Sequence, residues 1–217
     1  MIPTSREAPP RDTGLDGEVL DEAGVIRRLP MTISAGFLAD ILKPYRAHAR
    51  YLKSAEITHC NTIAPPDGTK DASLVTGTGR FSIHESCYID GTGHFNAAEF
   101  IICYNQLAYV VGGKCIDANL IHPFWHEKAS IPSIAEYKRD QLPRMMIASV
   151  DGVRFFKQMK SDDFRGELNI KKASVMGSTW FLLTSITFSD CEGVKAKGSV
   201  MLAFSPNLLP DQELTQL

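Results

Sequence analysis

The sequence predicts an α+β domain in which an antiparallel sheet buries one long helix. Residues 97–111 contain neither Pro nor Gly and place apolar side chains at every angle of a helical wheel, as in a helix enclosed on all sides. About two strand-like segments precede this stretch and about four follow it. A sheet of this size can bury its apolar face by curling around the single long helix.

The chain begins with a segment that we expect to be a flexible leader. Residues 1–30 are rich in Pro, Gly and charge and poor in aromatic residues, so they cannot bury enough surface to become ordered. A partner-docking arm is the alternative. We expect a single domain over 31–207 and a tail over 208–217. Within the domain, S-A-G-F-L-A-D-I-L at 34–42 predicts a short helix that stops before Pro44.

The remaining elements follow from changes in the spacing of apolar residues. An alternating pattern from Ala55, a turn at P-P-D-G and a second alternating run predict a hairpin before the long helix. Gly112 and Gly113 predict the C-terminal end of that helix. A short helix is expected from Ser133 to Pro143, and strands are expected at 145–159, 164–175, 180–188 and 198–204.

The sequence leaves one turn of this sheet open, and the edges of the sheet lead us to expect a second copy. D-G at 151–152 fits a tight hairpin or a bulge equally well. Such a sheet cannot cover both of its edges alone, so we expect pairing with a second copy as a homodimer or a higher homo-oligomer.

Composition excludes several classes of function. The chain has 217 residues, with 23 basic and 25 acidic residues, which gives no electrostatic reason to expect nucleic acid. No apolar signal core opens the chain and no run approaches the roughly 20 apolar residues of a membrane span, so we expect a cytoplasmic protein without membrane contact. The five cysteines form no C-x-x-C pair and are expected to be reduced thiols.

Common cofactor and nucleophile motifs are missing. His122 and His126 are four apart, but Pro123 lies between them and no acid completes a helical zinc motif. No G-x-S-x-G nucleophile elbow is present, and G-T-G at 77–79 lacks the rest of a phosphate-binding loop. We therefore expect neither a metal nor a cofactor.

Polar residues at the start of the long helix make the first candidate site. Asn96 and Glu99 have the spacing N-x-x-E, which fits a capping box and also fits a catalytic pair. The free N–H groups and positive dipole end of the helix could hold a thioester oxygen as it becomes an oxyanion or enolate. His94, in a Gly-flanked loop, is a candidate proton carrier, although a lone histidine in a loop is more often an ordinary surface residue.

Further polar residues lie along the same helix. Asn105 and Tyr109 share a face one turn apart and form either a satisfied amide–phenol pair or part of a ligand pocket. Gln106 lies on the strip of Glu99 and could orient it. An amide without a partner in an enclosed helix costs about 1–3 kcal/mol, so each of these groups needs a bonding partner or a ligand.

The run F-S-I-H-E-S-C-Y-I-D-G-T-G-H-F-N-A-A-E-F-I-I-C-Y-N-Q-L-A-Y at 81–109 is similar to the signature of the FcoT-like family of hotdog-fold acyl-thioester enzymes. A looser similarity extends from L-K-P-Y at 42–45 to about residue 204. The resemblance implies a hotdog fold, an antiparallel sheet wrapped around one long central helix. It also implies an enzyme that acts on acyl chains carried as thioesters by coenzyme A or by an acyl carrier protein.

The resemblance carries specific residues as well. Family members described as long-chain acyl thioesterases rely on tyrosines and asparagines that correspond here to Tyr45, Tyr88, Asn96 and Asn105, with Tyr109 as a further position. Relatives in isonitrile-lipopeptide and β-amino-acid macrolactam pathways instead add glycine to the β-carbon of a 2-enoyl thioester, in some cases with hydrolysis afterwards. Asp90 stands where the family pattern has a basic residue, which leaves the carrier and the acyl group open.

The resulting expectation is glycine addition to a 2-enoyl thioester, with or without release of an N-carboxymethyl-3-amino acid. His94 or Glu99 would take the ammonium proton, Asn96 would hold the enolate and Tyr88 would supply a proton. Residues that bind the substrate or shape its pocket would be Tyr45, Asn105, Gln106 and Tyr109. The alternatives are a long-chain acyl-CoA thioesterase without amine addition, and a non-catalytic module that binds acyl chains or carrier proteins.

Overall fold

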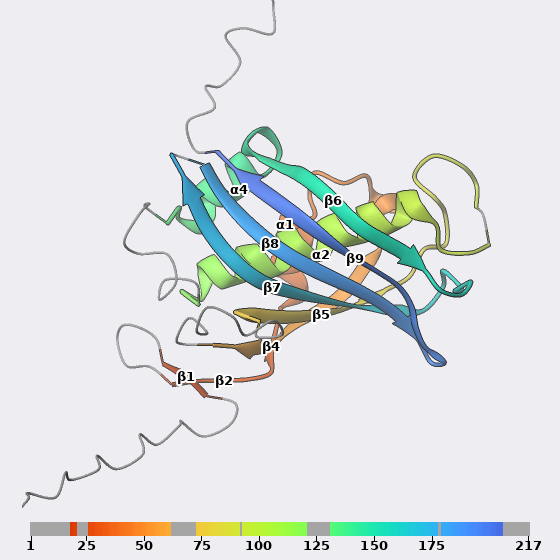
Figure 1. Cartoon of the computed structure of the whole chain (residues 1–217), viewed down its shortest axis with the longest axis horizontal. Coiled ribbons are helices and arrows are strands. Elements are labelled where there is room, and N and C mark those ends of the chain that lie inside the picture. The colour runs from red at the N-terminus through yellow and green to blue at the C-terminus, as the bar shows by residue number, and fades with distance from the viewer. Residues whose placement is uncertain are drawn as a thin grey trace, which may run out of the picture.

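The computed structural model describes residues 18–20, 26–61, 73–91, 93–120, 131–177 and 179–205. A curved antiparallel sheet with strand order β3-β4-β5-β7-β8-β9-β6 wraps around helix α2 (Figure 1), which confirms the predicted α+β class and the hotdog arrangement. The elements of this domain are α1 (Ala35–Ile41), α2 (Ala97–Asp117), α4 (Ile134–Arg144), the 3-10 helix η1 (Ala47–Ala49), β3 (Met31–Thr32), β4 (Leu52–Cys60), β5 (Val75–Phe81), β6 (Met145–Phe155), β7 (Phe164–Met176), β8 (Thr179–Asp190) and β9 (Gly193–Phe204).

Helix α2 is largely buried, as its apolar composition predicts, but it is not enclosed on all sides, because Ile101, Ile102 and Asn105 are only half-buried. The sheet covers one side of it, while α1, α4 and the segment before β4 pack on other sides. Its N-terminal end lies at the right of Figure 1, where the loop after β5 enters the helix. Phe100, Cys103, Tyr104, Leu107 and Val111 are all fully buried along it. Burial of such side chains contributes about 1.5–3 kcal/mol each, so this helix is the centre of the core.

The prediction that Gly112 and Gly113 end the helix is wrong. α2 continues to Asp117, and Ala118 is its C-cap. The two glycines instead allow close packing, because a Cβ atom on Gly113 would lie 3.0 Å from both Ile41 and Tyr137. Helices α1 and α4 therefore approach the backbone of α2 at this turn.

A cluster of phenylalanine rings fills the space between the first turns of α2 and the sheet. We define the phenylalanine cluster as Phe81, Phe95, Phe100, Phe155, Phe164 and Phe188. Phe81 and Phe164 stack at 5.3 Å between ring centroids, and Phe95 lies 4.9 Å from both Phe164 and Phe188. Packed aromatic pairs of this kind stabilise the fold by about 0.5–1.5 kcal/mol each beyond their buried area.

The strands agree with the predicted pattern apart from their ends. β4 and β5 form the predicted antiparallel hairpin, whereas its P-P-D-G turn lies outside the described residues. β6 ends at Phe155 and not at residue 159, because the chain turns there to bond with the loop before α2. The register of β6 and β9 shifts between Asp151 and Arg154, and Gly152 has a φ of +60°, so D-G marks a bulge.

The helices flanking α2 also agree with the sequence. Ser34 caps α1 and Ser133 caps α4, the latter with a complete capping box. α4 extends one residue past Pro143, which sits in its last turn. Within the predicted leader, the strands β1 (Glu18–Leu20) and β2 (Ile26–Arg28) pair as a short ribbon. Of the other leader residues only Leu29 and Pro30 are described, and the predicted tail 208–217 lies outside the described residues.

The cysteines, the possible metal ligands and the possible membrane spans can be examined among the described residues. All five cysteines are free thiols; Cys60, Cys103 and Cys115 are buried, whereas Cys87 and Cys191 are exposed. In the described part of the chain, no group of His, Cys, Asp or Glu side chains could hold a metal ion. His122 and His126 lie outside it. None of its helices is long and apolar enough to cross a membrane.

Gly77 provides a test of how tightly β5 packs on α2. A Cβ atom there would overlap the side chain of Val111. We expect Gly77→Ala to lower the free energy of unfolding by about 1–3 kcal/mol, measured by urea denaturation. Gly36→Ala is the matched control, because Gly36 lies in α1 and a Cβ atom added there would contact nothing. This variant should raise the free energy of unfolding by up to about 1 kcal/mol. Equal effects at the two positions would contradict the packing.

Candidate active site

Asn96 joins the start of α2 to a tyrosine in the preceding loop. Its Oδ1 accepts hydrogen bonds from the backbone N–H groups of Ala98 at 2.9 Å and Glu99 at 3.2 Å. Its Nδ2 donates to the hydroxyl of Tyr88 at 2.9 Å. The backbone N–H of Asn96 donates to Glu99 Oε2 at 3.1 Å, which completes the capping box. The cap uses the carbonyl end of this amide, and the amine end is left to orient Tyr88.

Tyr88 is positioned to offer a proton. Its side chain is 54% exposed, in the loop between β5 and α2. Because its oxygen accepts the hydrogen bond from Asn96, its own O–H points elsewhere and can donate to a ligand. The first helical residue, Ala97, has a backbone N–H with no acceptor inside the helix. This end of the helix therefore combines a phenol donor, a backbone donor and the positive end of a helix dipole.

The start of α2 borders an open depression of about 570 Å³, and Tyr88 is tied to this border through its hydrogen bond to Asn96. Residues 94–97 form one side of it and residues 155–158 form the other. The backbone N–H of Phe95 donates to the carbonyl of Met159 at 3.0 Å, which holds the two sides together. His94 lines the depression and is half-buried. The side made by Phe155, Phe156, Lys157 and Gln158 was not predicted, because the sequence there continues a strand-like pattern without a motif.

Glu99 lies behind this surface and does not line the depression. Its side chain is 1% exposed, and one of its oxygens accepts the N–H of Asn96. A carboxylate held in this way stabilises the start of the helix through the capping box and the dipole. The geometry therefore gives Glu99 a structural role in the site.

The other predicted residues lie farther along α2. From Asn96 to Tyr109 the helix rises about 20 Å at 1.5 Å per residue, so the candidates separate into an N-terminal group and a middle group. Asn105 in the middle group is half-buried. Gln106 is fully buried: its Oε1 accepts from the N–H groups of Tyr51 and Leu52, both at 2.9 Å, and its Nε2 donates to the carbonyl of Ala49 at 2.6 Å. These contacts fix the segment before β4 to the helix, and none of them involves Glu99.

Tyrosines gather around the middle group. Burial, and then the neighbouring Tyr109 and Cys103, raise the pKa of Tyr45 far above its usual range. Tyr109 is itself buried, which raises its pKa, and its carbonyl accepts a bond from the Tyr137 hydroxyl at 2.9 Å. The structure thus brings Tyr45 and Tyr109 together as neutral phenols. Tyr137, on α4, is a further tyrosine beside Tyr45 and Tyr109, and the sequence pattern did not identify it.

A separate apolar cavity of about 50 Å³ lies between the second half of α2 and the sheet. Its walls come from α2, α4 and strands β7, β8 and β9, and include Ala108, Gly112, Leu168, Trp180 and Leu202. Its lining is almost entirely apolar. An apolar cavity of this kind binds hydrocarbon in preference to water.

The three bonds of Gln106 allow a stability test. Gln106→Leu would leave two buried N–H groups and one carbonyl unpaired, so we expect a loss of about 3 kcal/mol or more in the free energy of unfolding. Gln141→Leu is the control, because the buried Gln141 makes one bond, from its Nε2 to the Ile41 carbonyl at 3.2 Å, and should cost about 1 kcal/mol. A Gln106→Leu protein as stable as the control would contradict the anchoring role.

The chain resembles known proteins over the region that contains this site. A family model described as an FcoT-like thioesterase domain matches residues 40–204. A (2E)-enoyl-ACP glycyltransferase from Streptomyces coeruleorubidus is 31% identical over 174 residues, covering 77% of this chain and 94% of that protein. One from Mycobacterium bovis is 34% identical over 177 residues, covering 79% and 86%. Among solved structures, the dehydratase heterocomplex ApeI:P from Xenorhabdus doucetiae aligns at 14% identity and a TM-score of 0.47, covering 84% of this chain and 94% of that chain.

Proposed function

Because the chain belongs to the FcoT-like thioesterase domain family, we propose that it adds glycine to the β-carbon of a 2-enoyl thioester carried by an acyl carrier protein, in the cytoplasm. The names of the two relatives at 31% and 34% identity support this reaction. The structural observation that carries the proposal is the Asn96–Tyr88 hydrogen bond at the start of α2, beside an open depression.

The reaction needs a base, hydrogen-bond donors for the enolate oxygen and a proton donor at the start of α2. The glycine ammonium loses a proton, its nitrogen forms a bond to the β-carbon, and the π electrons move through the α-carbon onto the thioester oxygen. The enolate oxygen takes hydrogen bonds from the N–H of Ala97 and the amide of Asn96 at the positive end of the helix. Tyr88 then returns a proton to the α-carbon, which restores the thioester carbonyl. One proton is removed and one is returned, so the addition is balanced.

His94 is the group that we assign to the ammonium proton. It lines the depression, whereas Glu99 is almost completely buried and bonded to the Asn96 N–H. A general base must come within hydrogen-bond reach of the proton it removes. Glu99 then fixes the helix start, Gln106 fixes the segment before β4, and Tyr45, Asn105 and Tyr109 shape the surface along which the acyl chain lies.

Hydrolysis is the second candidate function. Water attacking the thioester carbonyl would develop negative charge on the same oxygen, so the same donors at the start of α2 would serve. In this alternative the protein releases acyl chains from a carrier or from coenzyme A and does not use glycine. A third alternative is a module that binds acyl chains without turnover, since folds of this kind carry several functions.

Mass spectrometry of the product separates these functions. The protein is incubated with a 2-enoyl thioester with and without ¹³C-glycine. We expect the acyl product to gain the mass of glycine, either on the carrier or as the free acid. Unmodified acid formed equally with and without glycine would identify a thioesterase, and unchanged substrate in both reactions would favour the binding module.

The hydrogen bond of Asn96 to Tyr88 can be tested apart from the helix cap. Asn96→Ser keeps a capping oxygen but loses the amide donor, so we expect the melting temperature to change by no more than about 2 °C while kcat falls about 100-fold. Tyr88→Phe should cause a similar fall. The fall in kcat in the double variant should be smaller than the product of the two single falls, because both changes break the same hydrogen bond between Asn96 and Tyr88. Normal turnover in Asn96→Ser would rule out this role of the amide.

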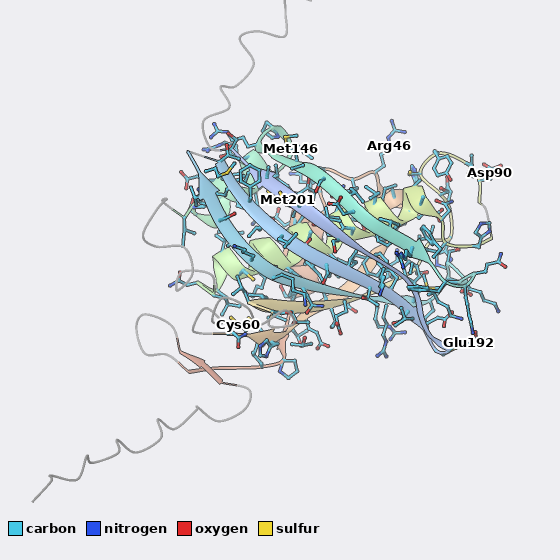
Figure 2. The ribbon with its side chains drawn as sticks, viewed as in Figure 1. Arg46, Cys60, Asp90, Met146, Glu192 and Met201 are labelled. Atoms are coloured by element: carbon cyan, nitrogen blue, oxygen red, sulfur yellow. The ribbon has the colours of Figure 1, made fainter. Side chains whose placement is uncertain are left out.

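We also propose that two copies pair along β6. This strand is one edge of the sheet and 11 residues long, and Met146 and Val150 are 57% and 41% exposed on it (Figure 2). A long edge with apolar side chains is a template for strand pairing. Met146→Lys/Val150→Lys is expected to give monomers in analytical ultracentrifugation, whereas Leu142→Lys on α4, also exposed, should leave the wild-type mass. A wild-type protein that sediments as a monomer would reject the pairing.

A further inference from the structure

We propose that residues 43–53 form a docking surface for the acidic carrier protein that brings the acyl chain. This inference rests on the proposed function, because that function requires a carrier. The docking surface consists of Lys43, Arg46, Arg50 and Lys53, with the backbone that connects them.

Positive charge is concentrated in this segment. It has four Lys or Arg among 11 residues, whereas the whole chain has 23 in 217 and a net charge of −2. From Ile41 to Ala55 the sequence contains no Asp or Glu. Lys43, Arg46 and Lys53 are exposed, and Arg46 points away from the body of the protein (Figure 2). A local excess of this kind attracts a partner of opposite charge even when the whole protein is slightly acidic.

No described acid forms an ion pair with a cation of the docking surface, although, beside the hydrogen bond from Lys138, Lys43 is close enough to Asp40 to help lower the pKa of that carboxyl. Asp40, the acid preceding the docking surface, is bonded to Lys138. Glu56, the acid following it, accepts a hydrogen bond from the Thr78 hydroxyl at 3.2 Å. No ion pair among the described residues involves Lys43, Arg46, Arg50 or Lys53. Their positive field is therefore available to a partner.

The docking surface is held in shape by its own cations. Arg50 donates to the carbonyl of Tyr45 at 3.0 Å and to that of Lys43 at 3.2 Å. Lys53 donates to the carbonyl of Arg50 at 2.8 Å. Gln106 then attaches residues 49, 51 and 52 to α2. Contacts to carbonyl groups order these side chains without cancelling their charge, so the surface is set before a partner arrives and less ordering is needed on binding.

The same segment leads inward to the proposed site. Tyr45, between Lys43 and Arg46, is directed toward Tyr109 and Cys103 of α2, which help to raise its pKa. Tyr51 is fully buried, with its phenol near Cys87, the neighbour of Tyr88. The segment thus exposes Lys43, Arg46 and Lys53 on the outside, while Tyr45 and Tyr51 face the protein interior. A carrier bound on the outside would hold its thioester arm beside residues proposed to contact the substrate.

A macromolecular partner fits these charges better than a single phosphate group does. A phosphate site brings several donors to one point, as Arg and Lys do around a bound phosphate. Here Lys43 follows α1, Arg46 precedes η1 and Lys53 lies on β4, so the cations are spread along a surface. An acidic protein face presents carboxylates that are spread in the same way.

The test compares one 2-enoyl chain on an acidic acyl carrier protein, on coenzyme A and on pantetheine. Lys43→Glu/Arg46→Glu changes side chains that make no hydrogen bond or ion pair within the described residues, so the fold should be retained. We expect its KM for the carrier-borne substrate to rise about tenfold at low salt, with kcat nearly unchanged. The pantetheine substrate should be unaffected, and added salt should reduce the difference between variant and wild type.

Arg165→Glu/Lys172→Glu is the matched control, because it reverses two exposed charges on β7. It should leave all three KM values unchanged. An equal rise in KM for the control variant would show a general charge effect. A rise in KM of the Lys43→Glu/Arg46→Glu protein that is as large with pantetheine would place the effect inside the site, and a rise with coenzyme A alone would show recognition of its phosphates. Each of these three results would overturn the docking surface.

Binding without turnover separates this inference from the proposed function. The fluorescence anisotropy of a dye-labelled holo carrier protein, which bears no acyl chain, is measured against the wild type and both double variants. We expect the Lys43→Glu/Arg46→Glu protein to bind about tenfold more weakly than the other two. This result would support the docking surface even if glycine were never transferred. Equal binding by all three proteins would reject it.

Discussion

Most of helix α2 is buried, with a half-buried strip that includes Ile101 and Asn105, so the polar atoms on its buried faces require partners within the protein. Gln106 supplies the clearest case, because its side chain bonds to the backbone at Ala49, Tyr51 and Leu52. Those bonds locate the start of β4, and β4 in turn pairs with β3 and β5. This buried amide therefore helps to fix the position of one sheet edge relative to the helix, together with the packing of β4 on α2.

The N-terminal end of the same helix combines stability with reactivity. Asn96 uses its carbonyl oxygen to cap the helix and its amide nitrogen to hold Tyr88. Capping and chemistry do not compete here, because they use different atoms of the side chain. Glu99 supports the cap from within the core. In this arrangement Asn96 stands at the start of the helix and holds Tyr88 of the preceding loop through a hydrogen bond.

The sequence was sufficient to predict the largely buried helix, the hairpin before it and the four strands after it, because apolar spacing and turn residues are local signals. The capping box at Asn96 was predicted for the same reason. The end of α2 was not, since the glycines at 112 and 113 are required by Ile41 and Tyr137, which are distant in the sequence. Long-range packing also explains why residues 155–158 were missed as a wall of the depression.

The site residues show the same division between local and long-range information. The bond between Asn96 and Tyr88 spans eight residues and depends on the path of an irregular loop, so neither residue alone predicts it. The partners of Gln106 are more than 50 residues away, and the expected contact with Glu99 was the nearer but incorrect choice. The proximity of Tyr45 to Tyr109 follows from how α1 and its turn fold back on α2.

The phenylalanine cluster separates two hollow regions of the domain. Its rings occupy the space between the sheet and the first turns of α2, so the depression at the helix start and the apolar cavity beneath its second half are separate compartments on that side. Under the proposed function, a chain attached to a thioester in the depression would have no path through these rings into the apolar cavity. The cluster therefore separates the polar groups at the start of α2 from the apolar interior of the domain.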